Sequence, residues 1–259
     1  MAGKFQRFAF FCLLILGTSY STGAAGGDDS VLRVMNLKLQ MRAAMSSSAQ
    51  PGPEELAHWV LAEGTKEGLP HVVGLSGLGD ATQVEDFIWP LNRSIGPDER
   101  SYVTWLTGGG KQAGVVAVVS LFPLVRFEEL SWRGAGLGIL YAVLDAPEGQ
   151  IHVVLVGDRR LTQERLGLGV AVERVVGRLL GLITRDHSQA RVILMGDVKP
   201  ELLGAEDVKG GFLQCVSCSV AKRETAGVIM VHSGLKTTWI RPLAQDLWLG
   251  GVLVELAPP

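Results

Sequence analysis

The chain has 259 residues, of which 47% are hydrophobic and 19% charged, and its formal net charge is −2. This balance excludes both a strongly basic nucleic-acid-binding surface and an acidic, solvated tail. Three cysteines are too few for a fold built on disulfides, and the 33 glycines show no triplet repeat, which excludes collagen. The composition therefore predicts a packed domain with a substantial core.

The first 25 residues have the three-part pattern of a secretory signal peptide. Lys4 and Arg7 precede an apolar run at 8–17, and a small, polar stretch ends near Ala24 and Ala25. The apolar run of about ten residues is shorter than the roughly 20 that a membrane-spanning helix needs, although a retained anchor is the alternative. We expect residues 1–25 to be removed and residues 26–259 to form a secreted or periplasmic domain without a stable membrane span.

Hydrophobic spacing and turn residues predict mostly strands along the rest of the chain. Acidic residues in the first turn after two prolines indicate a helix at 54–67, and the turn at 146–149 indicates a hairpin. In chain order, the predicted elements are strand 31–39, helix 54–67, strand 71–75, helix 84–89, strands 102–106, 113–120, 137–144 and 151–156, helix 161–183, and strands 191–195, 227–232 and 252–256. This order favours one α/β domain of mixed sheets covered by helices.

Seven segments follow one another along the chain: LRVMNLKL, LPHVVGLSGL, AGVVAVVSLFPL, IHVVLVGDRR, RVILMGDVKPE, VIMVHSGL and LWLGGVLVEL. In this order they resemble the endonuclease/exonuclease/phosphatase superfamily, which includes DNase I-like nucleases, inositol polyphosphate phosphatases and sphingomyelinases. The resemblance implies a four-layer α/β/β/α sandwich, in which two packed mixed sheets are flanked by helices. It also implies that strand 71–75 lies beside strand 191–195 in the core.

The same resemblance implies a divalent-metal phosphoesterase, yet most of the residues for that chemistry are replaced. The metal-binding Asn that ends the first strand and the Glu that ends the second correspond to Lys38 and Gly77. The other replacements are Ser76 for Gln, Lys199 for the Asn of Gly-Asp-x-Asn, Gly227 for Asp, Gly157 or Asp158 for the His after the hairpin, and Leu247, Trp248 and Leu249 for Ser-Asp-His. Of these functional positions, only Asp197 is kept.

Together with the expected signal peptide, this loss predicts an exported, inactive protein that binds a protein or a small anionic ligand, with no cofactor. A hard cation needs several oxygen ligands, which Asp197 alone does not supply. We expect Lys38 and Lys199 to neutralise Asp197 in place of the metal; alternatively, both lysines point to solvent and Asp197 caps a turn. On this alignment, replacing Lys38 with Asn and Gly77 with Glu is expected to raise metal affinity.

The alternative function is a phosphoesterase whose carboxylate site has been rebuilt. Asp80, Asp158, Asp197 and Asp246 all fall near strand ends or family motifs, and together they would hold Mg²⁺ or Mn²⁺. In that case Asp197 and Asp158 are the candidate catalytic residues. Converging carboxylates of Asp80, Asp158 and Asp197 would favour this alternative.

Three smaller motifs are open to more than one interpretation. Cys215 and Cys218 form a C-x-x-C pair, for which a disulfide is expected in an exported chain and a thiol redox site is the weaker alternative. Asn92 begins an Asn-Arg-Ser glycosylation motif. The arginines at 159, 160 and 165 form either a solvated face or an anion contact.

Overall fold

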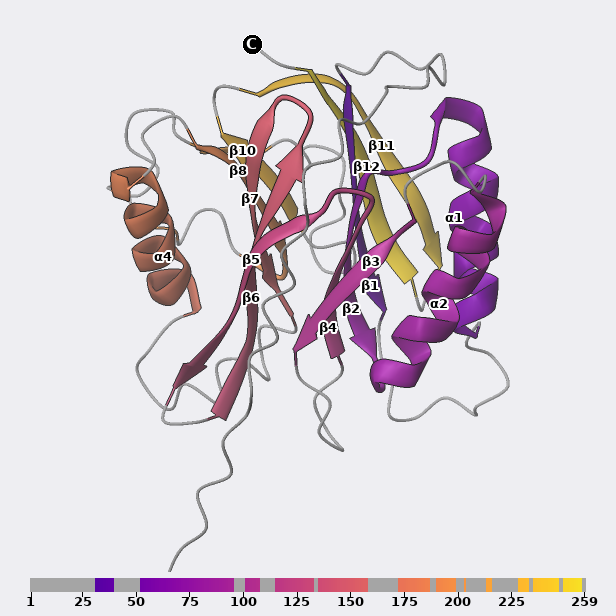
Figure 1. Ribbon diagram of the computed structural model, residues 1–259, viewed down its shortest axis with the longest axis horizontal. Coiled ribbons are helices and arrows are strands. Elements are labelled where there is room, and N and C mark those ends of the chain that lie inside the picture. Colours follow the sequence, from indigo (N-terminus) through magenta and orange to yellow (C-terminus); the bar gives the residue numbers. More distant parts are fainter. Residues whose placement is uncertain are drawn as a thin grey trace, which may run out of the picture.

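Figure 1 shows the fold in a computed structural model, which describes only part of the chain. The described residues are 31–39, 52–95, 101–107, 115–132, 135–157, 172–186, 190–198, 203, 213–215, 228–232, 235–246 and 249–257. The expected signal peptide, the arginines at 159, 160 and 165, and the candidate residues Asp158, Lys199, Cys218 and Gly227 lie outside them. None of the helices in the described part combines the length and apolar character needed to cross a membrane.

The described strands form two six-stranded mixed sheets (Figure 1). The first has the order β11 (Lys236–Asp246), β12 (Leu249–Ala257), β1 (Leu32–Leu39), β2 (Val72–Leu78), β4 (Val115–Ser120) and β3 (Val103–Thr107). The second has the order β5 (Leu124–Trp132), β6 (Ala135–Ala146), β7 (Gly149–Val156), β8 (Arg191–Gly196), β10 (Val228–His232) and β9 (Leu213–Cys215). The strands β1 and β2 are parallel to each other, as are β7 and β8.

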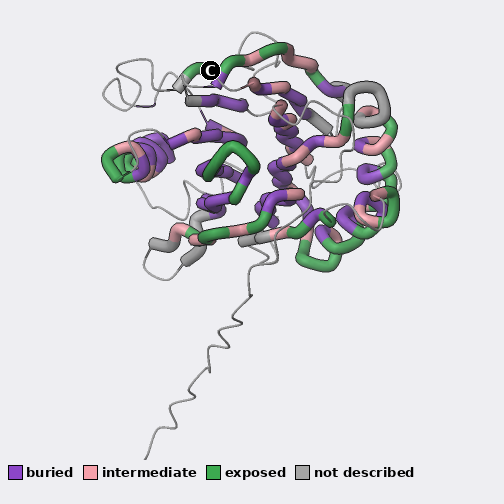
Figure 2. Tube along the Cα trace, turned by 45° about the horizontal axis from the view of Figure 1, so that its top comes forward, coloured by how far each residue is buried: buried purple, intermediate pink, exposed green. Residues whose placement is uncertain are grey.

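The three described helices cover the outer faces of the two sheets (Figures 1 and 2). Helices α1 (Pro53–Glu67) and α2 (Ala81–Ser94) pack on the first sheet, and α4 (Val172–Asp186) packs on the second. Each helix buries an apolar side and leaves its other side in solvent, which is the pattern of an amphipathic helix. The result is the expected four-layer α/β/β/α sandwich.

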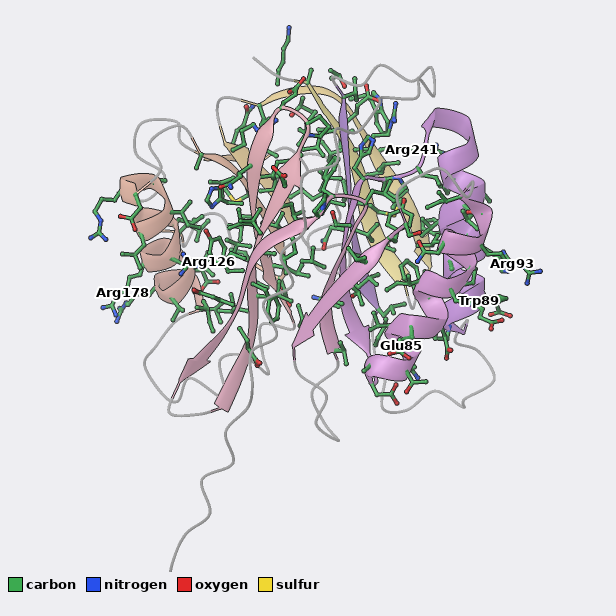
Figure 3. The ribbon with its side chains drawn as sticks, in the orientation of Figure 1. Glu85, Trp89, Arg93, Arg126, Arg178 and Arg241 are labelled. Carbon is green, nitrogen blue, oxygen red and sulfur yellow. The ribbon has the colours of Figure 1, made fainter. Side chains whose placement is uncertain are left out.

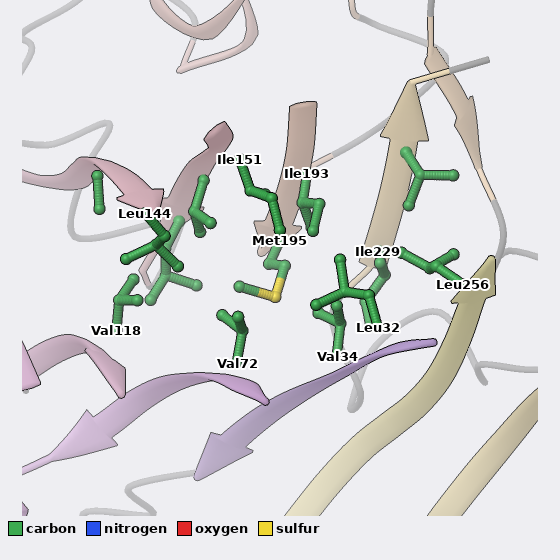
Figure 4. Packing of buried hydrophobic residues seen from close by; sticks show 14 of the residues in the cluster. Leu32, Val34, Val72, Val118, Leu144, Ile151, Ile193, Met195, Ile229 and Leu256 are labelled. Atoms are coloured by element: carbon green, nitrogen blue, oxygen red, sulfur yellow. The ribbon is translucent and has the colours of Figure 1, made fainter. Parts of the chain in front are cut away.

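The central core lies between the two sheets, as the alternation of apolar residues requires. Val34 and Val72 of the first sheet face Ile193 and Met195 of the second (Figure 4). The predicted neighbours, strands 71–75 and 191–195, therefore pack face to face from different sheets rather than pairing in one sheet. Gly74 contributes to this packing, because a Cβ there would lie only 3.0 Å from the Met195 side chain.

Most predicted elements are present, and those that were missed lie mainly at sheet edges. The strands β5, β9 and β11 were not predicted, and each ends a sheet. In β11, Pro242 interrupts the strand signal, although proline is tolerated at an edge, where only one neighbour is hydrogen-bonded. Helix α2 continues to Ser94 instead of ending at residue 89, and it contains Pro90. Residues 161–171 of the predicted long helix lie outside the described part.

Candidate functional site

The candidate site lies where the carboxyl ends of strands from both sheets meet. Lys38 stands near the end of β1, and Asp197 directly follows β8. The Lys38 side chain reaches across from the first sheet, and its Nζ donates to Asp197 Oδ2 at 2.8 Å. The parallel pairs β1–β2 and β7–β8 therefore end at one edge of the sandwich, which is where the family resemblance places its chemistry.

The pair between Lys38 and Asp197 is a partly buried ion pair. Their side chains are 15% and 29% exposed, respectively. Along β1, Lys38 shares a face with Val34 and Asn36, so strand alternation directs its stem into the space between the sheets. Removing one partner from such a pair leaves a partly desolvated charge, which is costly. The predicted contact of Lys38 with Asp197 is present, while Lys199 is not described.

The backbone at Gly196 sets the position of Asp197. Gly196 has a φ of +111°, and a Cβ there would overlap the carbonyl oxygen of Val156. The following amide, that of Asp197, donates to this same Val156 oxygen at 3.1 Å. Because only glycine tolerates this close approach, the Gly-Asp step turns the chain so that the carboxylate points toward Lys38.

A short polar layer lies beneath the ion pair, between it and the apolar core. Asn36 is fully buried and Ser76 is 4% exposed. In the β1–β2 register, Lys38 pairs with Ser76 and Asn36 pairs with Gly74. The side chains of Asn36, Ser76 and Lys38 therefore lie on the same face of the first sheet, in order toward the edge that carries the ion pair. The oxygens that this layer offers are neutral ones, from an amide and a hydroxyl.

Gly77 stands where the resemblance places the metal-binding Glu, and its backbone excludes one. Its φ is +94°, and a Cβ there would overlap the carbonyl oxygen of Leu39. The β2–β4 register also shifts between Ser76 and Leu78, so Gly77 occupies a β-bulge. This backbone geometry argues against the expectation that Gly77→Glu restores a ligand.

Gly157 similarly excludes a side chain at one candidate position for the family's His. It is buried, and a Cβ there would overlap the side chain of Val116. Its amide donates to the carbonyl of Gly138 at 2.8 Å, which fixes the end of β7 against β6. The other candidate position, Asp158, lies outside the described residues.

Asp80 has a structural role at the start of α2. Its Oδ1 accepts from the amide of Gln83 at 3.0 Å, and Gln83 Oε1 accepts from the amide of Gly79 at 2.7 Å. These are the contacts of an N-terminal helix cap. Among the described residues, no three His, Cys, Asp or Glu side chains are grouped as metal ligands. Asp246 is the fourth carboxylate of the alternative site, and its side chain is not among those that the structure describes.

Cys215 takes part in a disulfide. Its expected partner, Cys218, lies outside the described residues, so the pairing within the C-x-x-C motif stays a prediction. Cys215 ends β9 at the edge of the second sheet.

A buried Tyr–His contact was not predicted from the sequence. The Tyr141 hydroxyl lies 2.7 Å from His152 Nδ1, beneath α4 on the outer face of the second sheet. Burial raises the pKa of Tyr141, and the nearby Arg126 guanidinium opposes that rise. The predicted hairpin turn at 146–149 could have indicated this contact. It pairs Val143 with His152, which places Tyr141, two residues before Val143 on the same face, diagonally opposite His152.

Asn92, the candidate glycosylation residue, joins α2 to β3. Its Nδ2 donates to the carbonyl of Tyr102 at 2.9 Å, and its Oδ1 accepts from the Tyr102 amide. Tyr102 is in turn anchored by its hydroxyl, which donates to the carbonyl of Pro70, and burial raises the pKa of that hydroxyl. Asn92 thus satisfies both polar backbone groups of a residue that is 2% exposed.

Asn92→Ala is expected to lower the free energy of unfolding by about 2 kcal/mol, because it leaves the Tyr102 backbone groups without these partners. Denaturant unfolding measures the change. Ser94→Ala is the matched control, since it also destroys the glycosylation motif but keeps Asn92. Equal destabilisation by the two variants would point to a glycan rather than to the Asn92 hydrogen bonds.

Comparisons with known proteins identify the fold alone. No family model and no curated protein matches the sequence. Among solved structures, a humanized TDP2 of D. rerio has a TM-score of 0.58 at 12% identity, with 88% of this chain and 99% of that chain covered. The catalytic domain of human Nocturnin with bound sulfate has a TM-score of 0.55 at 13% identity, with 89% and 94% covered.

A third similar structure carries the superfamily's name. It is an endonuclease/exonuclease/phosphatase family protein from Leptotrichia buccalis, with a TM-score of 0.56 at 12% identity and with 86% of this chain and 99% of that chain covered. The chain therefore has the endonuclease/exonuclease/phosphatase fold, as the seven sequence segments predicted. At these identities the likeness describes architecture, and the activity has to be argued from the site.

Proposed function

We propose that this chain is an exported, catalytically inactive protein with the endonuclease/exonuclease/phosphatase fold, and that it acts by binding a protein or a small anionic ligand. The observation that carries the proposal is the ion pair of Lys38 with Asp197, at 2.8 Å. An ammonium group lies beside Asp197, the one functional position of the family motifs that the sequence keeps.

The ion pair argues against a divalent cation at this place. A hard cation such as Mg²⁺ takes near-octahedral oxygen ligands and usually one or two carboxylates. Here the Asp197 charge is already balanced, and Lys38 would repel an incoming cation. Gly77 supplies no carboxylate, and the buried neighbours Asn36 and Ser76 are neutral.

Loss of the remaining family groups supports inactivity. Phosphodiester hydrolysis needs a positioned water, a base and stabilisation of charge on the phosphoryl oxygens. Each missing group typically costs a factor of about 10² to 10⁴ in rate. Several losses together would reduce the family reaction below detection, so the fold is kept as a scaffold for binding.

Export is supported by two independent features. Residues 1–25 have the charged, apolar and small-residue order of a signal peptide. The disulfide at Cys215 agrees with an oxidising compartment. N-terminal sequencing of the secreted protein is expected to begin near Gly26, and a start at Met1 or Ala2 would count against cleavage.

The activity test combines calorimetric titration of the full chain with Mg²⁺ and Mn²⁺ and a fluorogenic phosphodiester assay. The expected result is no saturable metal binding and no turnover above a buffer blank. Asp197→Ala is the matched control, since it removes the carboxylate on which any residual site depends. Tight binding or turnover by the wild type that Asp197→Ala abolishes would overturn the proposal and favour the phosphoesterase with a rebuilt carboxylate site.

A further inference from the structure

Two of the four large apolar side chains exposed in the described part of the chain lie on outer helices. Trp89 of α2 is 58% exposed and Leu182 of α4 is 48% exposed. These helices belong to opposite outer layers of the sandwich, with both sheets between them (Figure 1). The two apolar side chains therefore point to solvent on opposite sides of the molecule.

The solvent-facing side of α4 is basic. Arg174, Arg178 and Arg185 are exposed and, like Leu182, recur at helical spacing on one face. Arg178 projects away from the molecule (Figure 3). Arg185 contacts the adjacent Asp186, so Arg174 and Arg178 dominate the charge around Leu182. We call this surface the α4 face. It is a local departure from a chain whose net charge is −2.

The solvent-facing side of α1 and α2 is acidic. Helix α1 ends just before β2 begins and α2 begins just after β2 ends, so both helices start at the same edge of the sheet. Their exposed charged side chains in the described part are Glu54, Glu55, Glu85, Asp86 and Arg93. We call this surface the α1–α2 face. Its Trp89 stands one helical turn from Glu85, on the side of the molecule opposite Arg178 (Figure 3).

We infer that the chain associates head to tail with a second copy of itself, the α4 face of one copy docking on the α1–α2 face of the next. The opposite charges select this arrangement, since a symmetric contact of either face with itself would oppose like charges. Leu182 and Trp89 would provide the apolar centre within a charged rim. The Arg93 guanidinium lies 5.1 Å from the Trp89 ring centroid, a cation–π contact within α2.

A head-to-tail contact leaves one free face at each end, so assembly continues into rings or open chains. The contact relies on exposed ion pairs, each of which is weak and screened by salt. The Debye length falls from about 10 Å at 0.1 M to about 3 Å at 1 M ionic strength. Association is therefore expected to depend on concentration and to weaken steeply with salt. Self-association through these two faces does not depend on whether the chain is catalytically active.

Sedimentation velocity of the full chain over a range of concentrations, at low and high salt, tests the inference. Charge reversal by Arg178→Glu or by Glu85→Arg is expected to weaken self-association about tenfold or more, because each reversal opposes like charges. An equimolar mixture of the two variants is expected to associate again, into dimers or larger species. Arg178→Glu keeps the native α1–α2 face and Glu85→Arg keeps the native α4 face, so one native contact is available, and the two reversed faces also carry opposite charges.

Lys236→Glu is the matched control, because it makes the same charge change as Arg178→Glu at an exposed site on the edge strand β11. It is expected to leave association close to that of the wild type. Three results would each overturn the inference: a wild type that stays monomeric at low salt, an equal effect of Lys236→Glu, or a mixture that fails to associate. The charge reversals also distinguish this contact from association through the apolar segment at 8–17, because the latter would be unchanged in Arg178→Glu and Glu85→Arg.

Discussion

Gly196→Ala is expected to lower the free energy of unfolding by about 3 kcal/mol or more. The residue has a φ of +111°, and the added Cβ would overlap the carbonyl oxygen of Val156. That oxygen also accepts from the Asp197 amide, so relief of the overlap would move the strand end that carries the carboxylate. Denaturant unfolding followed by circular dichroism measures the loss.

Gly181→Ala is the control for this substitution. Gly181 is an exposed residue of α4, and a Cβ placed there would meet no heavy atom within 4 Å beyond its chain neighbours and the backbone of its own helix. Alanine in a helix is expected to stabilise the fold by about 0.5–1 kcal/mol relative to glycine. Replacing glycine with alanine should thus lower the free energy of unfolding at position 196 and raise it at position 181. A Gly196→Ala protein as stable as the wild type would show that the Gly-Asp turn does not require its glycine.

The architecture could be predicted because strand order and alternation are written into the local sequence. Val34 and Val72 alternate with residues that face the helices, and this alternation defines the two sides of the first sheet. The edge strands β5 and β11 were more difficult to predict, because their sequences mix polar residues with apolar ones. An edge strand pairs on one side only and is partly solvated, so its hydrophobic signal is diluted.

The contact between Lys38 and Asp197 could be predicted only through the resemblance. The two residues are 159 positions apart, and neither local sequence contains a signal that points to the other. The motif order placed the ends of β1 and β8 at one edge, which made an opposite charge beside Asp197 plausible. The exposed fractions of the two side chains and the distance between Lys38 Nζ and Asp197 Oδ2 could be obtained only from the structure.

Two structural features near the site were not predicted, for different reasons. The role of Asp80 was present in the sequence, since an Asp followed three residues later by Gln83 is a capping pattern at a helix start. The geometry of Gly77 was not, because a positive φ and a β-bulge depend on how β2 meets its neighbours. Family alignment assigned a residue type to that position but not a backbone conformation.

Gly77→Glu is therefore expected to damage the fold rather than to rebuild a metal site. The variant should lose about 3 kcal/mol or more, since its Cβ would overlap the Leu39 carbonyl oxygen at a φ of +94°. Combined with Lys38→Asn, it should bind Mn²⁺ no better than Lys38→Asn alone. Thermal unfolding and calorimetric titration with Mn²⁺ measure the two effects.

Gly77→Ala separates the two possible causes of such a loss. Alanine adds the Cβ without a carboxylate, so a steric origin predicts that Gly77→Ala destabilises nearly as much as Gly77→Glu. An electrostatic origin predicts that Gly77→Glu lowers the free energy of unfolding and Gly77→Ala does not. It also predicts that the loss is smaller when Lys38 is present, because its positive charge would lie near the new carboxylate. If the double variant with Lys38→Asn is stable and binds Mn²⁺ more tightly than the wild type, the bulge at Gly77 can rearrange. The inactivity that we propose would then depend on two side chains rather than on the backbone of β2.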